Sequence, residues 1–432
     1  MGRFVHILSG SVAMQEKIFF HIDVNSAFLS WEAAYRLHVL GESVDLREIP
    51  SVIGGDKENR HGIVLAKSTS AKKLKIHTGE ALGAAVQKCP NLVIIPPNYQ
   101  RYVKASKSLM EILHRFSPKV EQYSIDEAFV DMSGSELLYG GPVIVANNLK
   151  DLIEEELKFT VNIGVSSNKL LAKMAGELKK PNLVHTMFPE EIPKKMWPLP
   201  VGELFFVGRA TEKKLFNLGI KTIGELAQTD VKILKAHFGK YGEVLYQFSH
   251  GIDESPLFVP LEANKGYGNS VTTPYDIVTM EHANLVLLSL SETVCTRLRM
   301  DGVKGQCVSV SVTTDTFQRA SHQGMLFSAS NTTMEVYRFA CRLFKNLWDG
   351  RTPIRQMGVH TSRITKESTM QYNLFDWDRY EKLSKLDETI DSIRKRYGDD
   401  SVMRACFLNT STYHMHGGIS KEKKTGITKP LR

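Results

Sequence analysis

Two short and widely separated stretches of the chain carry carboxylates in settings where carboxylates are costly. Asp23 lies near the end of an apolar run, Ile18 to Val24, that is typical of a buried strand. Asp126 and Glu127 lie between two short β-type runs, at or beside a predicted hairpin tip. Buried carboxylates need a compensating cation or hydrogen bonds. Three hard oxygen ligands without a neighbouring Cys or His cluster indicate a magnesium site.

The order of the predicted elements decides whether these acids can meet. Apart from an insertion over 28–97, the order is βαββαβ, the split ferredoxin-like arrangement, in which the end of the first strand meets the start of the third. Asp23 should therefore converge with Asp126 and Glu127. The predicted elements are strand Ile18 to Val24, helix Tyr99 to Phe116, strands Val120 to Tyr123 and Ala128 to Met132, helix Pro142 to Lys158 and strand Thr160 to Val165.

Three motifs occur along the chain: Asp23-Val24-Asn25-Ser26-Ala27-Phe28, Ser124-Ile125-Asp126-Glu127-Ala128, and Gly164 to Ala175 followed by Lys179-Lys180-Pro181-Asn182. In this order they resemble those of the Y-family translesion DNA polymerases of the bacterial DinB/UmuC type. The resemblance reaches to about Phe375 and implies low-fidelity, template-directed DNA synthesis past damaged bases. Asp23, Asp126 and Glu127 would be catalytic and, with the backbone of Val24, would hold two Mg²⁺ ions. Without the motif context, these acids would be solvated strand-end or turn residues.

The start of the first predicted helix, Ala27 to Leu40, would bind the incoming deoxynucleotide. Asn25-Ser26 is an N-cap signal for this helix. The resemblance makes Phe28 the steric gate, a ring under the sugar that leaves no room for a 2′-hydroxyl. The alternative is an ordinary core Phe of an amphipathic helix. The free amides of Asn25 to Phe28 at the helix N-terminus would suit the triphosphate.

Further triphosphate contacts are implied at Thr69, Lys72 and Lys180. At Ala66, Thr69 and Lys72 the family usually has Thr, Tyr and Arg. Lys72 therefore keeps the charge without the planar fork of Arg, and Thr69 has a hydroxyl with a much shorter reach. Lys180, before Pro181, aligns with another triphosphate lysine of the family; alone it would pass for a solvated helix end.

From about His185 the pattern changes to short helices, and 204–226 has the spacing of a helix-hairpin-helix. Such a hairpin offers backbone N–H groups to phosphates without reading bases. The alternative is a helical packing turn. The predicted DNA-binding residues are Val207, Gly208, Arg209 and Gly219.

After a tether, the pattern predicts a βαβ-type unit that corresponds to the family's DNA-contacting little finger. Its elements are helix Glu281 to Met300, a strand around Val308 to Val312, helix Met334 to Trp348 and strand Ile354 to Thr361. Exposed arginines often only solvate a face, but here they are candidate DNA-backbone contacts. They are Arg297, Arg299, Arg319, Arg351, Arg355 and Arg363.

The stretch Gln371 to Phe375 resembles the short peptide with which bacterial polymerases dock on the replication sliding clamp. Gln371 would be a polar anchor, and Leu374 and Phe375 apolar plugs. The alternative is that Leu374 and Phe375 pack in the core. The charged amphipathic pattern from Trp377 to Tyr397 predicts a helix that packs back on the little finger.

The predicted domain order combines these segments into an α+β protein. It comprises an N-terminal extension (1–16), palm (17–27 and 98–184), fingers (28–97), helical thumb (185–258), linker (259–268), little finger (269–370), clamp-binding peptide (371–375), C-terminal helical extension (376–416) and basic tail (417–432).

Composition agrees with a nucleic-acid partner. The chain has 432 residues, a net charge of +8 and a pI of about 9.0, which favours polyanions such as primer-template DNA. The five cysteines have no paired spacing, which argues against zinc and disulfides. Apolar runs are too short to span a bilayer, so a cytoplasmic monomer is expected.

Two rival functions stay open at this point. A catalytically impaired member of the same family would act as a clamp-tethered DNA-binding scaffold. A second rival is another nucleotide-condensing enzyme on the same palm fold, such as a cyclase. The cyclase is disfavoured by the helix-hairpin-helix and the docking peptide, since a cyclase needs neither DNA nor clamp.

Overall fold

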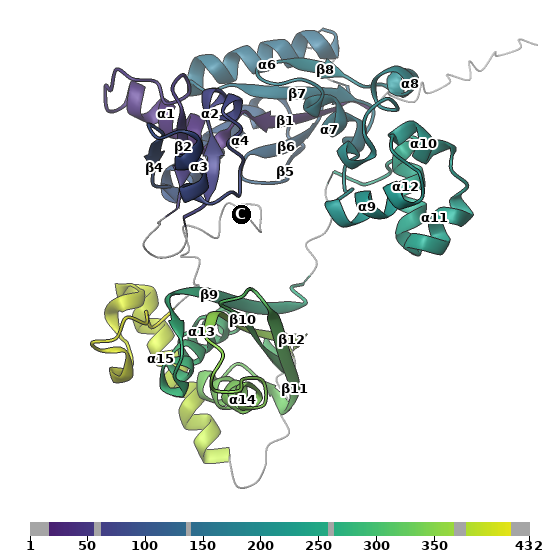
Figure 1. Ribbon diagram of the computed structural model, residues 1–432. Helices are drawn as coiled ribbons and strands as arrows, with labels where there is room; N and C mark the ends of the chain where they lie inside the picture. The colour runs from purple at the N-terminus through teal and green to yellow at the C-terminus, as the bar shows by residue number, and fades with distance from the viewer. Residues whose placement is uncertain (1–16, 56–61, 135–139, 258–262, 367–376, 416–432) are drawn as a thin grey trace, which may run out of the picture. The chain divides into compact units, whose positions relative to one another are not determined.

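A computed structural model describes residues 17–55, 62–134, 140–257, 263–366 and 377–415. The chain forms two compact units that divide near Pro260 (Figure 1). The predicted N-terminal extension, the clamp-binding peptide with Gln371, Leu374 and Phe375, the basic tail and the first part of the linker lie outside the described residues. Taken helix by helix, the described part of the chain holds none that is long and apolar enough to cross a membrane.

The palm contains a five-stranded sheet in the order β5-β6-β1-β7-β8. Strand β1 is antiparallel to both neighbours, and β8 joins β7 in parallel. Because the third strand of the βαββαβ unit, β6, lies between the first and second, the predicted ferredoxin-like order is confirmed. The strands are β1 (Phe19–Val24), β5 (Val120–Gln122), β6 (Glu127–Asp131), β7 (Val161–Ser166) and β8 (Val184–Thr186).

The two faces of β1 have different neighbours because successive side chains alternate across a strand. Phe20, Ile22 and Val24 enter the main core with α4 (Tyr99–Phe116) and α6 (Pro142–Leu157). His21 and Asp23 lie on the other face, where α7 (Lys169–Glu177) and the segment after it supply their side-chain partners.

Helix α7 packs closely on β7 because Gly164 has no side chain. A Cβ at Gly164 would lie 1.9 Å from the carbonyl oxygen of Ala172 and 2.4 Å from the amide nitrogen of Gly176. Both clashes involve backbone, which cannot move aside. The glycine therefore sets how near the side chains of α7 come to the sheet.

The fingers insert between β1 and α4 as a small sheet with three helices. The first helix, α1, begins at Ala27 as predicted, but the predicted side-chain cap is wrong. Ser26 has a left-handed backbone with φ 50° and makes no cap bond, while the Asn25 side-chain amide donates to the Thr160 hydroxyl at 3.1 Å. The elements are α1 (Ala27–His38), β2 (Ser51–Gly54), β3 (Val64–Lys67), α2 (Thr69–Lys73), α3 (Leu82–Lys88) and β4 (Val93–Ile95).

The thumb is a cluster of short helices whose core continues into α7. Leu170 and Leu171 of α7 pack with Leu204 and Leu215 of the thumb, so palm and thumb share a hydrophobic cluster. Its elements are η1 (Pro189–Glu191), α8 (Ile192–Lys195), η2 (Val201–Glu203), α9 (Arg209–Asn217), α10 (Ile223–Gln228), α11 (Val231–Phe238) and α12 (Lys240–Ser249).

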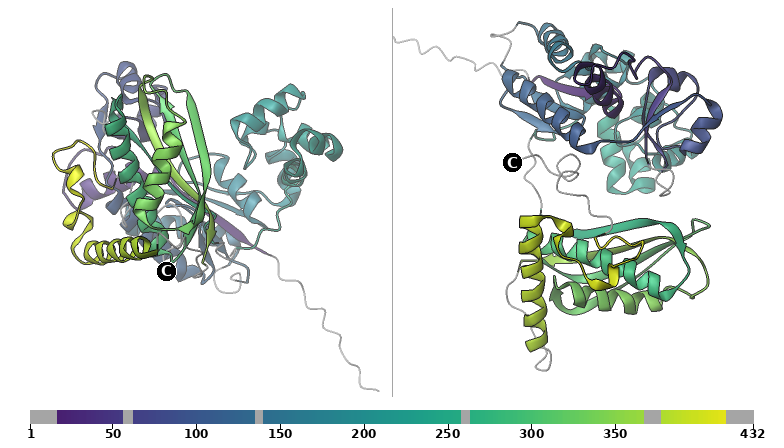
Figure 2. Two further views of the ribbon diagram at one scale, coloured as in Figure 1. Left: turned by 90° about the horizontal axis from the view of Figure 1, so that it is seen from below. Right: turned by 90° about the vertical axis from the view of Figure 1, so that its left-hand side faces the viewer.

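The C-terminal unit is a four-stranded antiparallel sheet in the order β11-β10-β12-β9. Helices α13 and α14 pack on one face of this little-finger sheet (Figure 2). The predicted βαβ-type unit was incomplete, because it lacked β9 and β11. The elements are β9 (Gly266–Ile277), α13 (Met280–Met300), β10 (Lys304–Thr314), β11 (Arg319–Ser330), α14 (Thr333–Lys345) and β12 (Ile354–Thr365).

The missed strands are the two edges of the sheet, and their sequences explain the miss. Strand β9 contains glycines and a proline, and β11 is mostly polar, so neither has the apolar alternation expected of a half-buried strand. Strand β9 also begins at Gly266, inside the stretch predicted as linker.

The C-terminal extension packs on the little finger, as predicted. Helix α15 (Trp377–Tyr397) contacts α13 and is followed by the short turns η3 (Asp399–Ser401) and η4 (Ala405–Phe407). Arg299 of α13 pairs with Asp387 and Asp391 of α15 and is nearly buried. The prediction of Arg299 as a DNA contact is therefore wrong, because the extension occupies its guanidinium.

Candidate active site

Strands β1 and β6 bring the predicted carboxylates to one edge of the palm sheet. Asp23 lies directly opposite Glu127 in the antiparallel register. The next amide, of Val24, donates to the carbonyl oxygen of Asp126 at 3.0 Å. Side chains opposite each other in such a pair lie on the same face, with Cβ atoms roughly 5 Å apart. Acids from opposite ends of the palm sequence thus share one small surface.

Asp23 is buried and has a lysine partner. The ammonium nitrogen of Lys180 lies 2.6 Å from its Oδ2 and 2.9 Å from Glu177. Burial raises the pKa of Asp23 to about 6, although the charge and hydrogen bond of Lys180 act in the opposite direction. Lys180, predicted to bind triphosphate, is therefore at the carboxylate edge.

Glu127 has two partners on the α7 side of the sheet. Lys173 donates to its Oε2 at 2.6 Å, and the His21 Nε2 lies 3.4 Å from the same oxygen. Burial alone would raise the pKa of Glu127, but the hydrogen bonds and the Lys173 charge lower it to about 2. Burial lowers the pKa of His21, which favours its neutral form. Glu127 is therefore held as an anion.

Asp126 precedes β6 and is held by its own turn. The Ser124 hydroxyl donates to Asp126 Oδ1 at 2.5 Å, and the Asp126 amide donates back to Ser124 Oγ at 3.3 Å. This ST-turn, in which the Ser124 hydroxyl accepts the amide two residues on, explains why Ser124 lies two residues before the acid.

The donor chemistry of this edge fits a hard divalent cation, although the side chains point elsewhere. Within the ranges that the structure describes, no three carboxylate, imidazole or thiol groups gather in a metal-binding arrangement. Asp23 and Glu127 instead face lysine ammonium groups, and Asp126 faces Ser124. Carboxylate oxygens are the ligands that Mg²⁺ prefers. Their present partners show that each of these positions accepts positive charge or a hydrogen-bond donor.

Sequence reasoning missed Lys173 and His21 as members of this site. Lys173 lies within the third motif, and His21 lies two residues before Asp23, on the same face of its strand. A period-two reading of β1 and a helical reading of α7 were the signals that could have found them.

Phe28, the predicted steric gate, lies on the first turn of α1 in an aromatic cluster. Its ring stacks on Tyr102, with centroids 4.6 Å apart and planes 10° apart, and lies 5.9 Å from Trp31 and 6.1 Å from Tyr99. Tyr102 is fully buried. The Phe28 ring therefore has a fixed support behind it.

The predicted fingers contacts, Thr69 and Lys72, lie on α2, and Ala66, which also departs from the family pattern, lies on β3. Thr69 opens α2, and Lys72 is in its last turn. Ala66 on β3 is buried in a small core with Leu29 and Ile53. An apolar methyl suits that core better than the hydroxyl that the family usually has there.

The predicted DNA-binding residues of the thumb lie at the two ends of α9. Val207, Gly208 and Arg209 precede or open the helix, and Gly219 follows it with φ 81°. A nine-residue helix spans roughly 13 Å, so Gly219 does not share one phosphate position with the other three.

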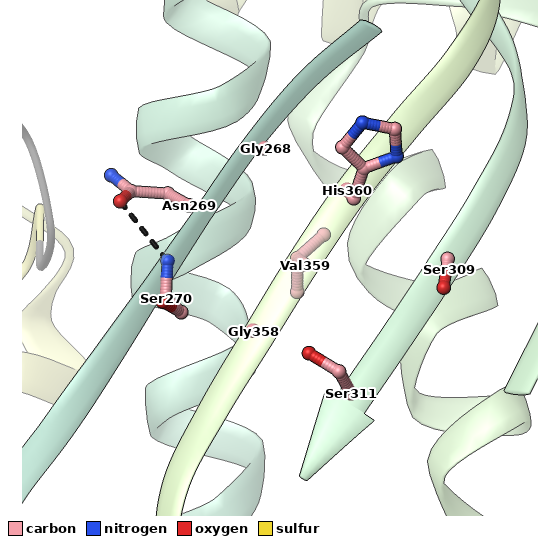
Figure 3. A pocket seen from close by; sticks show the side chains of 8 residues that line it. All are labelled: Gly268, Asn269, Ser270, Ser309, Ser311, Gly358, Val359 and His360. Carbon is pink, nitrogen blue, oxygen red and sulfur yellow. Dashed lines mark hydrogen bonds between the residues drawn. The ribbon is translucent and has the colours of Figure 1, made fainter. Parts of the chain in front are cut away.

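A shallow hollow lies on the little-finger sheet (Figure 3). Small and polar side chains form it, and the imidazole of His360 lies beside Gly268, where a Cβ would come within 2.6 Å of the ring. The hollow is therefore lined mainly by small side chains and by polar side chains that can form hydrogen bonds. The lining residues are Gly268, Asn269, Ser270, Ser309, Ser311, Gly358, Val359 and His360.

Comparison with known proteins agrees with this fold. The impB/mucB/samB family matches residues 22–177, its C-terminal domain matches 264–374, and a DNA polymerase-iota thumb domain matches 203–253. A solved Y-family DNA polymerase chimera has the same fold, with a TM-score of 0.66 at 22% identity, over 81% of this chain and all of the chimera. The chain belongs to the impB/mucB/samB family of Y-family DNA polymerases.

Its relatives include bacterial enzymes named DNA polymerase IV. The one from Clostridium acetobutylicum is 46% identical over 91% of this chain and 98% of the relative. DNA polymerase IV 2 of Bacillus subtilis is 37% identical over 92% of this chain and 96% of the relative. The chain is thus a translesion-type, DNA-directed DNA polymerase.

Proposed function

We propose that the enzyme extends a DNA primer with deoxynucleoside triphosphates at the carboxylate edge of the palm. Asp23, Asp126, Glu127 and the backbone of Val24 would hold two Mg²⁺ ions there. When bound, such ions lower the pKa of the primer 3′-hydroxyl and neutralise charge on the triphosphate. The observation that carries this proposal is the register of β1 and β6, which sets Asp23 opposite Glu127 and joins Val24 to Asp126.

Lys180 is the cation next to Asp23, and its ammonium group would orient the triphosphate. It already contacts Asp23 at 2.6 Å, so phosphate oxygens and Asp23 would be held by one positive charge. The Ser26, Ala27 and Phe28 amides at the start of α1 would bind phosphate oxygens, since the first amides of a helix have no partner within it. Thr69 and Lys72 would bind the outer phosphates.

The Phe28 ring would select deoxyribose. Because the Phe28 ring stacks on the buried Tyr102, it would not move aside to make room for a ribose 2′-hydroxyl. Low fidelity and lesion bypass accompany such a site in this family, because a small fingers insertion encloses the base pair loosely.

DNA would be held by backbone contacts away from the acids. Gly208 and Arg209 at the start of α9 offer amides and a positive charge to phosphates. Gln371, Leu374 and Phe375, which lie outside the described residues, would dock on the sliding clamp.

Replacing Asp126 tests this assignment. We expect Asp126→Ala to lower Mg²⁺-dependent primer extension by on the order of 10³-fold, because a metal site supplies several kcal/mol of transition-state stabilisation. Extension past a defined lesion and on undamaged template would both be measured. DNA affinity, measured by fluorescence anisotropy, should stay unchanged.

The matched control is Asp131→Ala at the far end of β6, where Asp131 pairs with Lys119 at 3.0 Å. The control should keep the extension rate within about twofold, as surface ion pairs contribute little. Undiminished extension by Asp126→Ala would sink the assignment. An unmodified protein that binds DNA but extends nothing would favour the scaffold alternative.

A further inference from the structure

Helix α7 carries two lysines one turn apart in closely matched surroundings. Lys169 pairs with Glu121 and Lys173 with Glu127, each at 2.6 Å. Lys169 lies over the Phe129 ring at 5.0 Å, and Lys173 lies over the Tyr123 ring at 5.5 Å. Of the two carboxylates, Glu127 belongs to the proposed catalytic set and Glu121 does not. The Lys169–Glu121 pair can therefore serve as a control for the Lys173–Glu127 pair on the same helix.

Lys173 has a second ring beside it, which comes from the thumb. Its ammonium nitrogen lies 5.2 Å from the centroid of Phe205, which lies 6.2 Å from Tyr123. The group is therefore flanked by one palm ring and one thumb ring, and the residue is 9% exposed. Cations are attracted to the faces of aromatic rings, more strongly where water is excluded.

The remaining contacts of Lys173 lead to Glu127. The His21 Nε2 lies 3.4 Å from both the Lys173 nitrogen and Glu127 Oε2, so three groups form a closed triangle. Both contacts to the carboxylate fall on Oε2, and neither falls on Oε1. The triangle restrains the carboxylate from one side only.

The backbone of α7 gives this triangle little room to shift. A Cβ at Gly176 would lie 3.2 Å from His21 Nδ1, in addition to the backbone clashes at Gly164. His21 is fully buried. Because helix and strands are in direct contact, the reach of the Lys173 side chain is set by the fold rather than by a flexible loop.

We propose that Lys173 is a positioning residue for the polymerase reaction. It holds Glu127 through Oε2 and leaves Oε1 to a ligand. Because the Phe205 ring of the thumb lies against the Lys173 ammonium group, the position of Phe205 also affects the orientation of the Glu127 carboxylate. The proposal rests on the proposed role of Glu127 in catalysis. Lys173 contacts Glu127, His21 and the two rings, and would act on the reaction through Glu127.

The test compares Lys173→Met with Lys169→Met in steady-state primer extension. Loss of a residue that orients a metal ligand typically costs about 10–100-fold, so kcat of Lys173→Met should fall by that amount. KM for the deoxynucleotide should stay within about twofold, since the defect is in chemistry. Lys169→Met, which loses a pair of equal length and a contact to the Pro256 carbonyl, should keep kcat within about twofold.

Two readouts do not depend on turnover. DNA affinity by fluorescence anisotropy, and deoxynucleotide affinity with Ca²⁺ in place of Mg²⁺, should be unchanged in Lys173→Met.

Phe205→Leu removes the thumb ring and keeps the charge. It should lower kcat about two- to fivefold, as expected for one cation–π contact.

Glu127→Gln serves as the reference, with an expected loss of on the order of 10³-fold. If it is inactive while Lys173→Met turns over at the unmodified rate, the positioning proposal alone is wrong. Equal losses in Lys173→Met and Lys169→Met would also overturn it. If Glu127→Gln retains full kcat, the carboxylate assignment fails, and the role of Lys173 with it. Should Lys173→Met not fold, Lys173→Gln takes its place with the same expected split of kcat from KM.

Discussion

Two buried ionic clusters in this molecule are built from the same charges in different ways. The palm cluster joins carboxylates to lysines and a histidine; its members are His21, Asp23, Glu127, Lys173 and Lys180. The little-finger cluster joins carboxylates of α13 and α15 to arginines; its members are Glu292, Arg299, Asp387, Asp391, Arg394 and Arg404.

The arginines make several bonds each. Arg299 donates to both oxygens of Asp391, at 2.6 and 3.0 Å, and to the Asn331 carbonyl at 2.8 Å. Asp387 also accepts from the Thr333 amide at the start of α14, at 2.7 Å. Such a cluster ties the three helices α13, α14 and α15 together. Planar, multiply bonded arginines suit permanent interfaces.

The lysines of the palm make point contacts and leave part of each carboxylate uncommitted. Lys173 and His21 meet only one of the two oxygens of Glu127, and the Lys180 contact is to Oδ2 of Asp23. A compact ammonium group makes a point contact, in contrast to the planar fork of an arginine, so it binds one oxygen of each carboxylate. The difference teaches that the palm cluster leaves one oxygen of each carboxylate for a further ligand, whereas the little-finger cluster uses the bonds of its arginines to join helices.

The largest expected effect is in the little-finger cluster. Glu292→Gln leaves Arg394 and Arg404 without their shared carboxylate in a buried setting. We expect the C-terminal unit to lose about 3–5 kcal/mol of unfolding free energy, the usual cost of breaking a buried pair. Calorimetry of the full chain measures this.

The control for that variant is Glu281→Gln, on the exposed first turn of the same helix. Its unfolding free energy should change by less than about 1 kcal/mol. At temperatures where the C-terminal unit stays folded, Glu292→Gln should extend primers within about twofold of the unmodified rate. An unaltered calorimetric transition would break the comparison.

The opposite outcome is expected for the palm. Lys180→Met should lower kcat/KM for the deoxynucleotide about 100-fold, equivalent to about 2.7 kcal/mol, and shift the melting temperature little. The reason is that the Lys180 side chain is one-third exposed and meets Asp23 at a single atom. Steady-state kinetics and thermal melting would be measured together, with Lys179→Met as the exposed neighbouring control. Equal kinetic losses in the two variants would remove Lys180 from the site.

A smaller effect is expected where the palm uses packing instead of charge. Phe28→Val should lower discrimination against ribonucleotides about 10–100-fold, because a smaller side chain leaves room for the 2′-hydroxyl. The measurement is the ratio of kcat/KM for a deoxynucleotide and its ribonucleotide on the same primer. Deoxynucleotide incorporation is the internal control. An unchanged ratio would take the gate role from Phe28.

The smallest effect is expected at Lys72. Lys72→Arg restores the planar fork that the family usually has, so KM for the deoxynucleotide should fall about two- to fivefold. Lys73→Arg, at the next and exposed position of α2, should leave KM unchanged. If KM for the deoxynucleotide fell equally in both variants, the lower KM would come from replacing any lysine of α2 by arginine, and Lys72 would have no specific contact.

Much of the fold was predictable because local signals agreed with it. Helix Tyr99–Phe116 has its predicted bounds, and the four strands of the βαββαβ unit differ from prediction by at most one residue at each end. Strand β8 was not predicted, and it extends into the range predicted as thumb. Apolar runs ended by turn residues marked these elements. The edge strands of the little finger were harder, since their glycines and polar side chains give no apolar alternation.

The placement of acids on strand ends and the order of the motifs were properties of the sequence alone. They were enough for the family, the fold class and the acidic edge. The partners of those acids were decided only in three dimensions. Lys173 and Lys180 follow Glu127 and Asp23 by many residues, and their contact depends on a glycine at position 164 that lets α7 lie against the sheet. Arg299 has a structural role for the same reason. Its partners, Asp387 and Asp391, are remote in sequence and reach it only because α15 packs on α13, which no local pattern encodes.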